Sequence, residues 1–126
     1  MKLYKLIAAT LVLFLTPQLA TAQDVSTGET VFKKCAACHA ADDSTNKVGP
    51  HLGHVVGRTP GTIEGFKYSK AMIDAGASGL VWDEVALSEY LVAPKAKVPG
   101  TKMTFAGLKK PEEVQSVVAY LKSISQ

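Results

Sequence analysis

Apolar and polar positions alternate most clearly at helical spacing near the C-terminal end of the chain. Five apolar residues recur there along one face: Val114, Val117, Val118, Leu121 and Ile124. Pro111 suits the first turn of a helix, and the acidic Glu112 and Glu113 favour the positive end of its dipole. The pattern predicts a last helix that begins at Pro111 and buries one face.

A first helix is expected before the two cysteines of the chain. The Ser26 hydroxyl can cap the backbone, while Glu29, three residues later, completes a capping box. These residues predict a helix that begins near Ser26 and ends in the cysteine pair, Cys35 and Cys38. We expect the apolar face of the last helix to pack against it.

Two shorter helices are expected in the middle of the chain. The first runs from Ser69 to about Ala75, before the glycines at positions 76 and 79. The second follows Asp83, which can cap it, and ends at Pro94. Its apolar surface is expected to come from Val85, Leu87, Tyr90 and Leu91.

The remaining segments are expected to be loops. Residues 40–66 and 94–110 are interrupted by glycine and proline and show no sustained helical period. No segment after residue 22 is typical of a strand. The sequence therefore predicts an all-α fold in which the N- and C-terminal helices pack together. A loop as long as residues 40–66 in a small domain needs a partner around which it can fold.

The N-terminal residues have the order of features of a secretory signal peptide. Two lysines precede an apolar run from Leu6 to Leu15, and small residues lead to Ala22. A membrane-spanning helix needs roughly 20 apolar residues, so a permanent anchor is the weaker interpretation. We expect residues 1–22 to be removed after Ala22 and residues 23–126 to form one exported domain in the periplasm.

Composition narrows the class of protein further. The 126 residues are 47% hydrophobic and 20% charged, which excludes a disordered chain or a multi-span membrane protein. The whole chain has a net charge of +3, but two of its 14 basic residues lie in the expected signal peptide. The mature domain is nearly neutral, so its charge gives no support to nucleic-acid binding.

The chemistry of the chain is indicated by the run Cys35-Ala36-Ala37-Cys38-His39. Two thiols at this spacing, followed at once by a histidine, are typical of covalent haem attachment. A disulfide, a redox dithiol and a zinc half-site are the alternatives. Zinc would need two further good ligands, and only His51 and His54 remain. A redox dithiol would need a neighbouring strand and helix, which the pattern lacks. We therefore expect one covalently bound haem c, with His39 on its iron.

A second iron ligand must come from elsewhere in the chain. The candidates are Met72, Met103, His51 and His54. Met103 follows a proline and a glycine in a segment without helical period, which can direct a thioether toward the iron. Thioether ligation favours ferrous haem and raises the reduction potential. We expect Met103 to be the ligand and Met72 to be packing.

These residues resemble the class I cytochrome c family, in particular small bacterial periplasmic cytochromes c and their mitochondrial relatives. The resemblance covers residues 28–121. Besides the haem motif, it rests on Gly49-Pro50-His51-Leu52, Gly57-Arg58, Gly65-Phe66-Lys67-Tyr68-Ser69, Trp82, Glu89-Tyr90-Leu91, Pro94, Val98-Pro99-Gly100-Thr101-Lys102-Met103 and Phe105-Ala106-Gly107. It implies the cytochrome c fold, with long loops wrapping one haem.

The resemblance also implies roles around the haem. The Pro50 carbonyl would accept the Nδ1 hydrogen of His39. The Tyr90 hydroxyl would lie near the Met103 sulfur. Gly28 and Phe32 would meet Tyr120 and Leu121 where the terminal helices cross. Hydrogen-bond donors to the haem propionates would be Arg58, Tyr68, Trp82 and Thr101. One departure is Met72, where the family often has asparagine, so a polar network beside the haem is in question.

The family resemblance implies a one-electron carrier and not an enzyme, because two filled axial positions leave no coordination site for a substrate. An electron-transfer subunit of a periplasmic dehydrogenase is the alternative, and a haem enzyme or gas sensor is a weaker one. The expected donor is a quinol-oxidising cytochrome complex. The acceptor would be a terminal oxidase, a photosynthetic reaction centre or a periplasmic reductase.

We expect the carrier to be a monomer whose lysines steer it toward acidic partners. The family arranges such lysines around the exposed haem edge. The candidate docking ring here is Lys33, Lys34, Lys95, Lys97, Lys102, Lys109 and Lys110.

Overall fold

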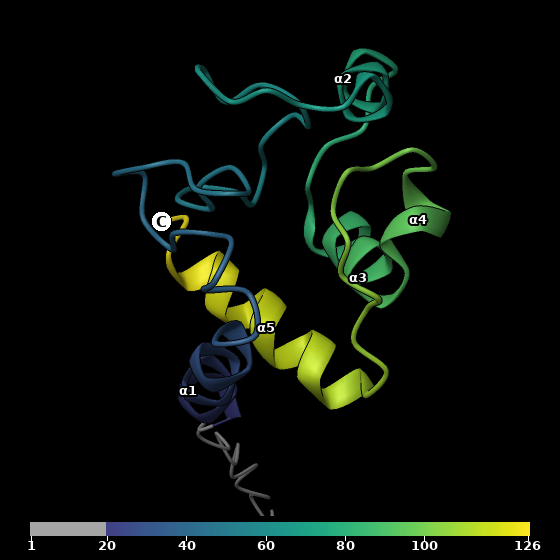
Figure 1. Cartoon of the computed structure of the whole chain (residues 1–126). Helices are drawn as coiled ribbons and strands as arrows, with labels where there is room; N and C mark the ends of the chain where they lie inside the picture. Colours follow the sequence, from purple (N-terminus) through teal and green to yellow (C-terminus); the bar gives the residue numbers. More distant parts are fainter. Residues whose placement is uncertain (1–19) are drawn as a thin grey trace, which may run out of the picture.

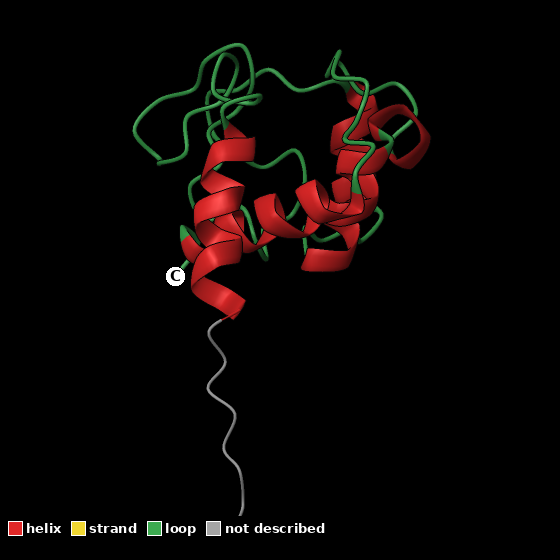
Figure 2. Ribbon diagram, turned by 90° about the horizontal axis from the view of Figure 1, so that it is seen from below, coloured by secondary structure: helices red, strands yellow, loops and turns green. Residues whose placement is uncertain are grey.

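The computed structural model describes residues 20–126, which contain five helices and no strand (Figures 1 and 2). The helices are α1 (Ala20–Phe32), α2 (Lys70–Ala77), α3 (Glu84–Val92), α4 (Pro94–Lys97) and α5 (Pro111–Ser123). The all-α prediction is confirmed. Long loops connect the helices, and α1 lies beside α5 (Figure 1). Most of the expected signal peptide lies outside the described residues.

The contact between α1 and α5 forms one end of the core. Val117, at 1% exposed, and Leu121, at 3% exposed, turn the apolar face of α5 inward. The rings of Phe32 and Tyr120 are 5.3 Å apart between centroids. A Cβ on Gly28 would overlap the Ser116 carbonyl oxygen, so the two helices approach as closely as a glycine permits. The predicted pairing of the terminal helices is confirmed.

The limits of α1 differ from the prediction. The helix begins at Ala20, so Ser26 lies inside it, and the Ser26 carbonyl accepts a hydrogen bond from the Thr30 hydroxyl. The residues before Ser26 include Thr21, Asp24 and Val25, which are weak helix formers, so local propensity alone does not account for the earlier start. At its other end α1 stops at Phe32, and the cysteine pair lies in the turns that follow.

The cap of α3 is the one predicted, whereas Ser69, the expected first residue of α2, is its cap. The Ser69 hydroxyl accepts the N–H of Met72 at 3.1 Å, and the Asp83 carboxylate accepts the N–H of Ala86 at 2.7 Å. Leu87 and Tyr90 are buried, as expected for the core face of α3. Val85 is 67% exposed, so its predicted place in the apolar surface of this helix is wrong. It lies on the opposite side of the helix from the core.

Helix α4 was not expected, because Pro94 was interpreted only as the end of the preceding helix. Pro94 also occupies the first position of α4, where its missing N–H costs nothing. Segment 94–110 is therefore a one-turn helix followed by a loop. The Val98 N–H donates to the Pro94 carbonyl at 2.9 Å and closes this turn.

One residue of the long loop has a strained backbone. His54 has φ +56°, in the left-handed region that favours glycine, and its exposed ring contacts the Ser125 carbonyl at 3.5 Å. His54→Gly is expected to raise the free energy of unfolding by about 0.5–1 kcal/mol, since it removes the left-handed cost. Chemical denaturation of the haem-loaded protein measures this.

A matched control for this substitution lies three residues further on. Gly57 has φ +92° and nothing within 4 Å of its missing Cβ, so Gly57→Ala adds only backbone strain. It is expected to lower the free energy of unfolding by about 1 kcal/mol. If His54→Gly also lowered the free energy of unfolding, the contact of the His54 ring with the Ser125 carbonyl would outweigh the backbone strain at His54.

The candidate haem site

The attachment motif lies in tight turns directly after α1. The Cys35 N–H donates to the Phe32 carbonyl at 2.7 Å, and the N–H groups of Cys38 and His39 both donate to the Cys35 carbonyl. Both cysteines are free thiols, Cys38 exposed and Cys35 half-buried. Burial raises the pKa of the Cys35 thiol, although Lys34 acts in the opposite direction. The turn therefore brings two thiols and an imidazole together without a disulfide.

His39 is oriented by the loop that follows it. Its Nδ1 lies 2.7 Å from the Pro50 carbonyl oxygen, which can only accept a hydrogen bond, so Nδ1 carries the proton. Burial lowers the pKa of His39, and the bond to Pro50 partly offsets this. The ring is thus a neutral imidazole with its lone pair on Nε2. That is the state and the atom that an iron ligand needs.

Gly49 also packs closely against the His39 ring. A Cβ at Gly49 would overlap the His39 imidazole, and the Gly49 N–H donates to the Cys38 carbonyl at 2.8 Å. The loop therefore follows the ring so closely that only a glycine fits. The donor set of Cys35, Cys38 and His39, with an oriented lone pair, fits a covalently attached haem.

Met103 lies half-buried in the loop after α4, packed against the core. The Thr101 N–H donates to the Val98 carbonyl at 3.0 Å, and the Met103 N–H donates to the Thr101 hydroxyl at 3.4 Å. The hydroxyls of Thr101 and Tyr90 are 2.7 Å apart. Burial raises the pKa of Tyr90, and the bond to Thr101 partly opposes this. Together these bonds fix the loop that carries Met103.

The other candidate ligands have different surroundings. Met72, on the buried face of α2, is only 9% exposed and belongs to the hydrophobic core. His54 is exposed and contacts the Ser125 carbonyl. His51 is half-buried, and its Nδ1 is buried without a hydrogen-bond partner. Within residues 20–126, no group of three histidine, cysteine or acidic side chains is placed to hold a metal ion.

Two of the predicted propionate donors are joined through the backbone. The Trp82 N–H donates to the Arg58 carbonyl, and the Gly57 N–H donates to the Trp82 carbonyl, both at 2.8 Å. The Arg58 guanidinium donates to the carbonyls of His51 and Gly53. Burial lowers the pKa of Arg58, but an arginine stays charged. The structure thus brings Arg58 and Trp82 together.

Tyr68 and Thr101 make other bonds. The Tyr68 hydroxyl accepts the Ile63 N–H at 3.2 Å, and burial raises its pKa. Its ring meets the Phe66 ring edge-on, with centroids 4.8 Å apart. Thr101 pairs with Tyr90. Sequence analysis expected separate roles for Thr101 and Tyr90, and it missed their contact because they lie on different elements.

Comparison with known proteins identifies the chain. Residues 25–125 match the cytochrome c family. The chain belongs to the cytochrome c family. It is 51% identical over 100 residues to cytochrome c2 from Afifella marina, covering 79% of this chain and 81% of that protein. It is 46% identical over 122 residues to cytochrome c2 from Blastochloris viridis, covering 96% and 94%.

A solved structure agrees with this family. Cytochrome cH from Methylobacterium extorquens superposes with a TM-score of 0.72 at 44% identity, covering 79% of this chain and 98% of that one. The cytochrome c fold and the class I resemblance are confirmed. As a member of this family the chain carries one covalently attached haem c and is an electron-transfer protein, not an enzyme.

Each half of the attachment motif can be tested by mutation. Cys35→Ala or Cys38→Ala removes one of the two thiols that are expected to bond to the haem vinyl groups, and either is expected to lower the yield of covalent haem protein severalfold. Haem stain on a denaturing gel and the mass of the intact protein measure this. Ala37→Ser, in the same turn, is the control and is expected to mature normally.

Several lysines of the expected docking ring bond to neighbouring residues. Lys34 pairs with Glu113 at 2.9 Å, and Lys97 pairs with Glu89. The Lys109 ammonium donates to the carbonyls of Ala106 and Val92. Sequence analysis missed Lys47, whose ammonium donates to the Ala36 carbonyl at 3.2 Å, inside the haem motif.

Proposed function

We propose that the protein is a periplasmic one-electron carrier whose haem iron is held by His39 and Met103. The observation that carries this is the bond from His39 Nδ1 to the Pro50 carbonyl, which presents Nε2 as the free ligand atom. When bound, haem c takes up and gives up a single electron at its iron. The relatives support the proposal, since several are named cytochrome c2 and one is named cytochrome c-550.

The chain's own residues would set the properties of that site. The thiols of Cys35 and Cys38 attach the group, and the Pro50 carbonyl strengthens His39 as a ligand. The Met103 thioether favours the ferrous state. The bonds among Tyr90, Thr101 and the Met103 backbone hold this loop in place without a change of shape. In this proposal Arg58, Tyr68, Trp82 and Thr101 supply donors for the propionates.

The proposal extends to partners and location. A quinol-oxidising cytochrome complex would supply the electron, and a terminal oxidase, a photosynthetic reaction centre or a periplasmic reductase would take it up. The lysine ring would steer a monomeric carrier toward acidic docking sites. No helix within residues 20–126 is long and apolar enough to cross a membrane. Cleavage after Ala22 stays a prediction, which the mass of the exported protein tests.

The test is a spectrum and a redox titration of the protein exported together with a haem-maturation system. We expect a sharp low-spin reduced spectrum, a methionine-to-iron band in the oxidised protein, and a titration that fits a single electron. Carbon monoxide should bind slowly or not at all. Rapid carbon monoxide binding to the native reduced protein would contradict the carrier and favour a sensor or an enzyme.

A further inference from the structure

One peptide group in the loop after the haem motif is hydrogen-bonded at both ends. Its carbonyl, that of Pro50, accepts the Nδ1 hydrogen of His39 at 2.7 Å. Its N–H, that of His51, donates to the side-chain oxygen of Asn46 at 3.0 Å. The Asn46 oxygen, the peptide group and the His39 imidazole therefore form one series of hydrogen bonds, which we call the Asn46 network. It ends at the lone pair of His39 Nε2.

Hydrogen bonds in such a series polarise one another. A peptide group whose N–H donates a bond carries more negative charge on its carbonyl oxygen, which strengthens the next bond by roughly 10–30%. Asn46 therefore strengthens the bond between the Pro50 carbonyl and His39, although its own bond lies at the other end of the peptide group. A stronger bond at Nδ1 makes the imidazole a more basic ligand.

The backbone holds this peptide group in place from both sides. The Gly49 N–H, which precedes it, donates to the Cys38 carbonyl at 2.8 Å. The Leu52 N–H, which follows it, donates to the Ala40 carbonyl at 2.9 Å. Two backbone bonds thus fix the loop against the residues on either side of the imidazole. Loss of a side chain outside these two segments should therefore weaken the bond to the imidazole without displacing the carbonyl.

The amide of Asn46 is oriented by a second bond. The side chain is half-buried, and its Nδ2 donates to the Glu64 carbonyl at 3.5 Å. A carbonyl can only accept a hydrogen bond and a backbone N–H can only donate one, so the two partners define which side of the amide carries the oxygen. The oxygen faces the His51 N–H, as the Asn46 network requires.

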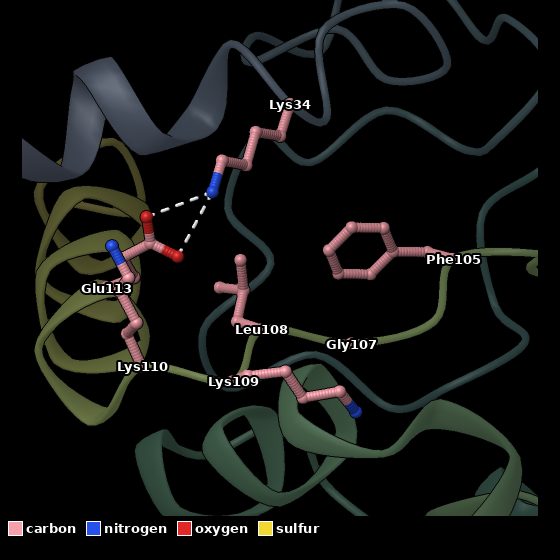
Figure 3. A pocket seen from close by; sticks show the side chains of 7 residues that line it. All are labelled: Lys34, Phe105, Gly107, Leu108, Lys109, Lys110 and Glu113. Atoms are coloured by element: carbon pink, nitrogen blue, oxygen red, sulfur yellow. Dashed lines mark hydrogen bonds and ion pairs between the residues drawn. The ribbon is translucent and has the colours of Figure 1, made fainter.

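The charged side chains of this region are bonded elsewhere. The Asp42 carboxylate accepts a backbone N–H two residues further on at 3.0 Å, and the Lys47 ammonium donates to the Ala36 carbonyl at 3.2 Å. Lys34, in the turn after α1, is directed toward Glu113 of α5 (Figure 3). The peptide N–H therefore meets a neutral amide oxygen, whose effect on the imidazole can be increased by adding a charge or removed by truncation.

We infer that Asn46 is a positioning residue for the iron site: it strengthens the bond from Pro50 to His39 and so lowers the reduction potential of the carrier. This inference rests on the proposed function, in which His39 binds the iron. A more basic imidazole stabilises ferric iron, the more positive state, relative to ferrous iron. The Met103 thioether acts in the opposite sense, so the two ligands and the Asn46 network together set the potential.

The test is a redox titration of two Asn46 variants of the haem-loaded protein. Asn46→Ala removes the acceptor of the peptide N–H. It is expected to change the reduction equilibrium about two- to fivefold, which raises the potential by about 20–40 mV. Asn46→Asp keeps an acceptor and gives it a negative charge, so it should lower the potential below the native value. In NMR spectra of the reduced protein, the His39 Nδ1 hydrogen should move to lower chemical shift in Asn46→Ala and to higher chemical shift in Asn46→Asp.

Thr45 supplies a matched control for each substitution. It is exposed, and its hydroxyl donates to the backbone carbonyl of Asn46 at 3.1 Å, outside the Asn46 network. Thr45→Ala matches the truncation and should change neither the potential nor the His39 resonance. Thr45→Asp matches the added charge. It should lower the potential less than half as far as Asn46→Asp and leave the His39 resonance in place.

The signs of the two shifts distinguish bond strength from a purely structural role. Both Asn46 variants lose the donor to Glu64, so a structural role would shift the potential in the same direction in both. Shifts of the same sign, an unmoved His39 resonance, or an equal effect of Thr45→Asp would overturn the inference. If Asn46→Ala failed to mature, the comparison of Asn46→Asp with Thr45→Asp would still decide.

These outcomes are separate from those that test the proposed function. All four variants should keep the low-spin spectrum, the methionine-to-iron band and the single-electron titration, because neither residue is an expected haem ligand. If they keep these features and the potential does not change, the inference fails and the carrier stands. Rapid carbon monoxide binding to the native protein would defeat the proposed function whatever the variants do.

Discussion

Replacing Met103 with leucine is expected to abolish the methionine-to-iron band and lower the reduction potential by on the order of 0.1 V or more, since axial ligands set haem potentials over about 0.8 V. Covalent haem should remain, because Cys35 and Cys38 are unchanged. Leucine keeps the volume of the side chain but has no sulfur. Visible and near-infrared spectra and a redox titration measure the two effects. The reduced variant should also bind carbon monoxide rapidly.

Met72 supplies a matched control for this substitution. It is the other methionine of the described residues, and its side chain packs in the core at 9% exposed. Met72→Leu should keep the methionine band and change the potential little, with a loss of stability below about 1.5 kcal/mol. If Met72→Leu lost the band and Met103→Leu kept it, the assignment of the ligand would be reversed.

The helix caps are features of local sequence, and the Asp83 cap was predicted. Ser69 and Asp83 act on N–H groups three residues away in the chain, so their role depends only on local spacing. The start of α5 at Pro111 is local in the same way. The start of α1 could not be found by this reasoning, because the capping pattern of Ser26 and Glu29 lies inside the helix and not at its end.

The haem site likewise contains some features that local sequence predicts and others that depend on contacts between distant segments. The spacing of Cys35, Cys38 and His39 is a local signal, and the family resemblance adds Pro50 as the partner of His39. The need for Gly49 arises only when the loop folds back over the imidazole. Likewise, Lys34 and Glu113 are 79 positions apart, and neither sequence segment indicates that they pair. Contacts between distant segments depend on the packing of α1 against α5.

Replacing Gly28 with alanine is expected to lower the free energy of unfolding by about 1–3 kcal/mol. In an isolated helix this change would stabilise by about 1 kcal/mol, because alanine is the better helix former. Here the added Cβ would overlap the Ser116 carbonyl oxygen and lie 2.8 Å from the Tyr120 Cβ. Neither the carbonyl nor the helix backbone can give way cheaply, so α1 must move away from α5.

Chemical denaturation of the haem-loaded protein measures this loss, and Thr27→Ala is the control. Thr27 is exposed on the same turn of α1, so its replacement reports helix propensity alone and should be neutral or slightly stabilising. A stabilised Gly28→Ala variant would contradict the close approach of the two helices. Because α1 leads directly into the turn that holds Cys35, its displacement should also broaden the haem spectrum, an effect that Thr27→Ala should not produce.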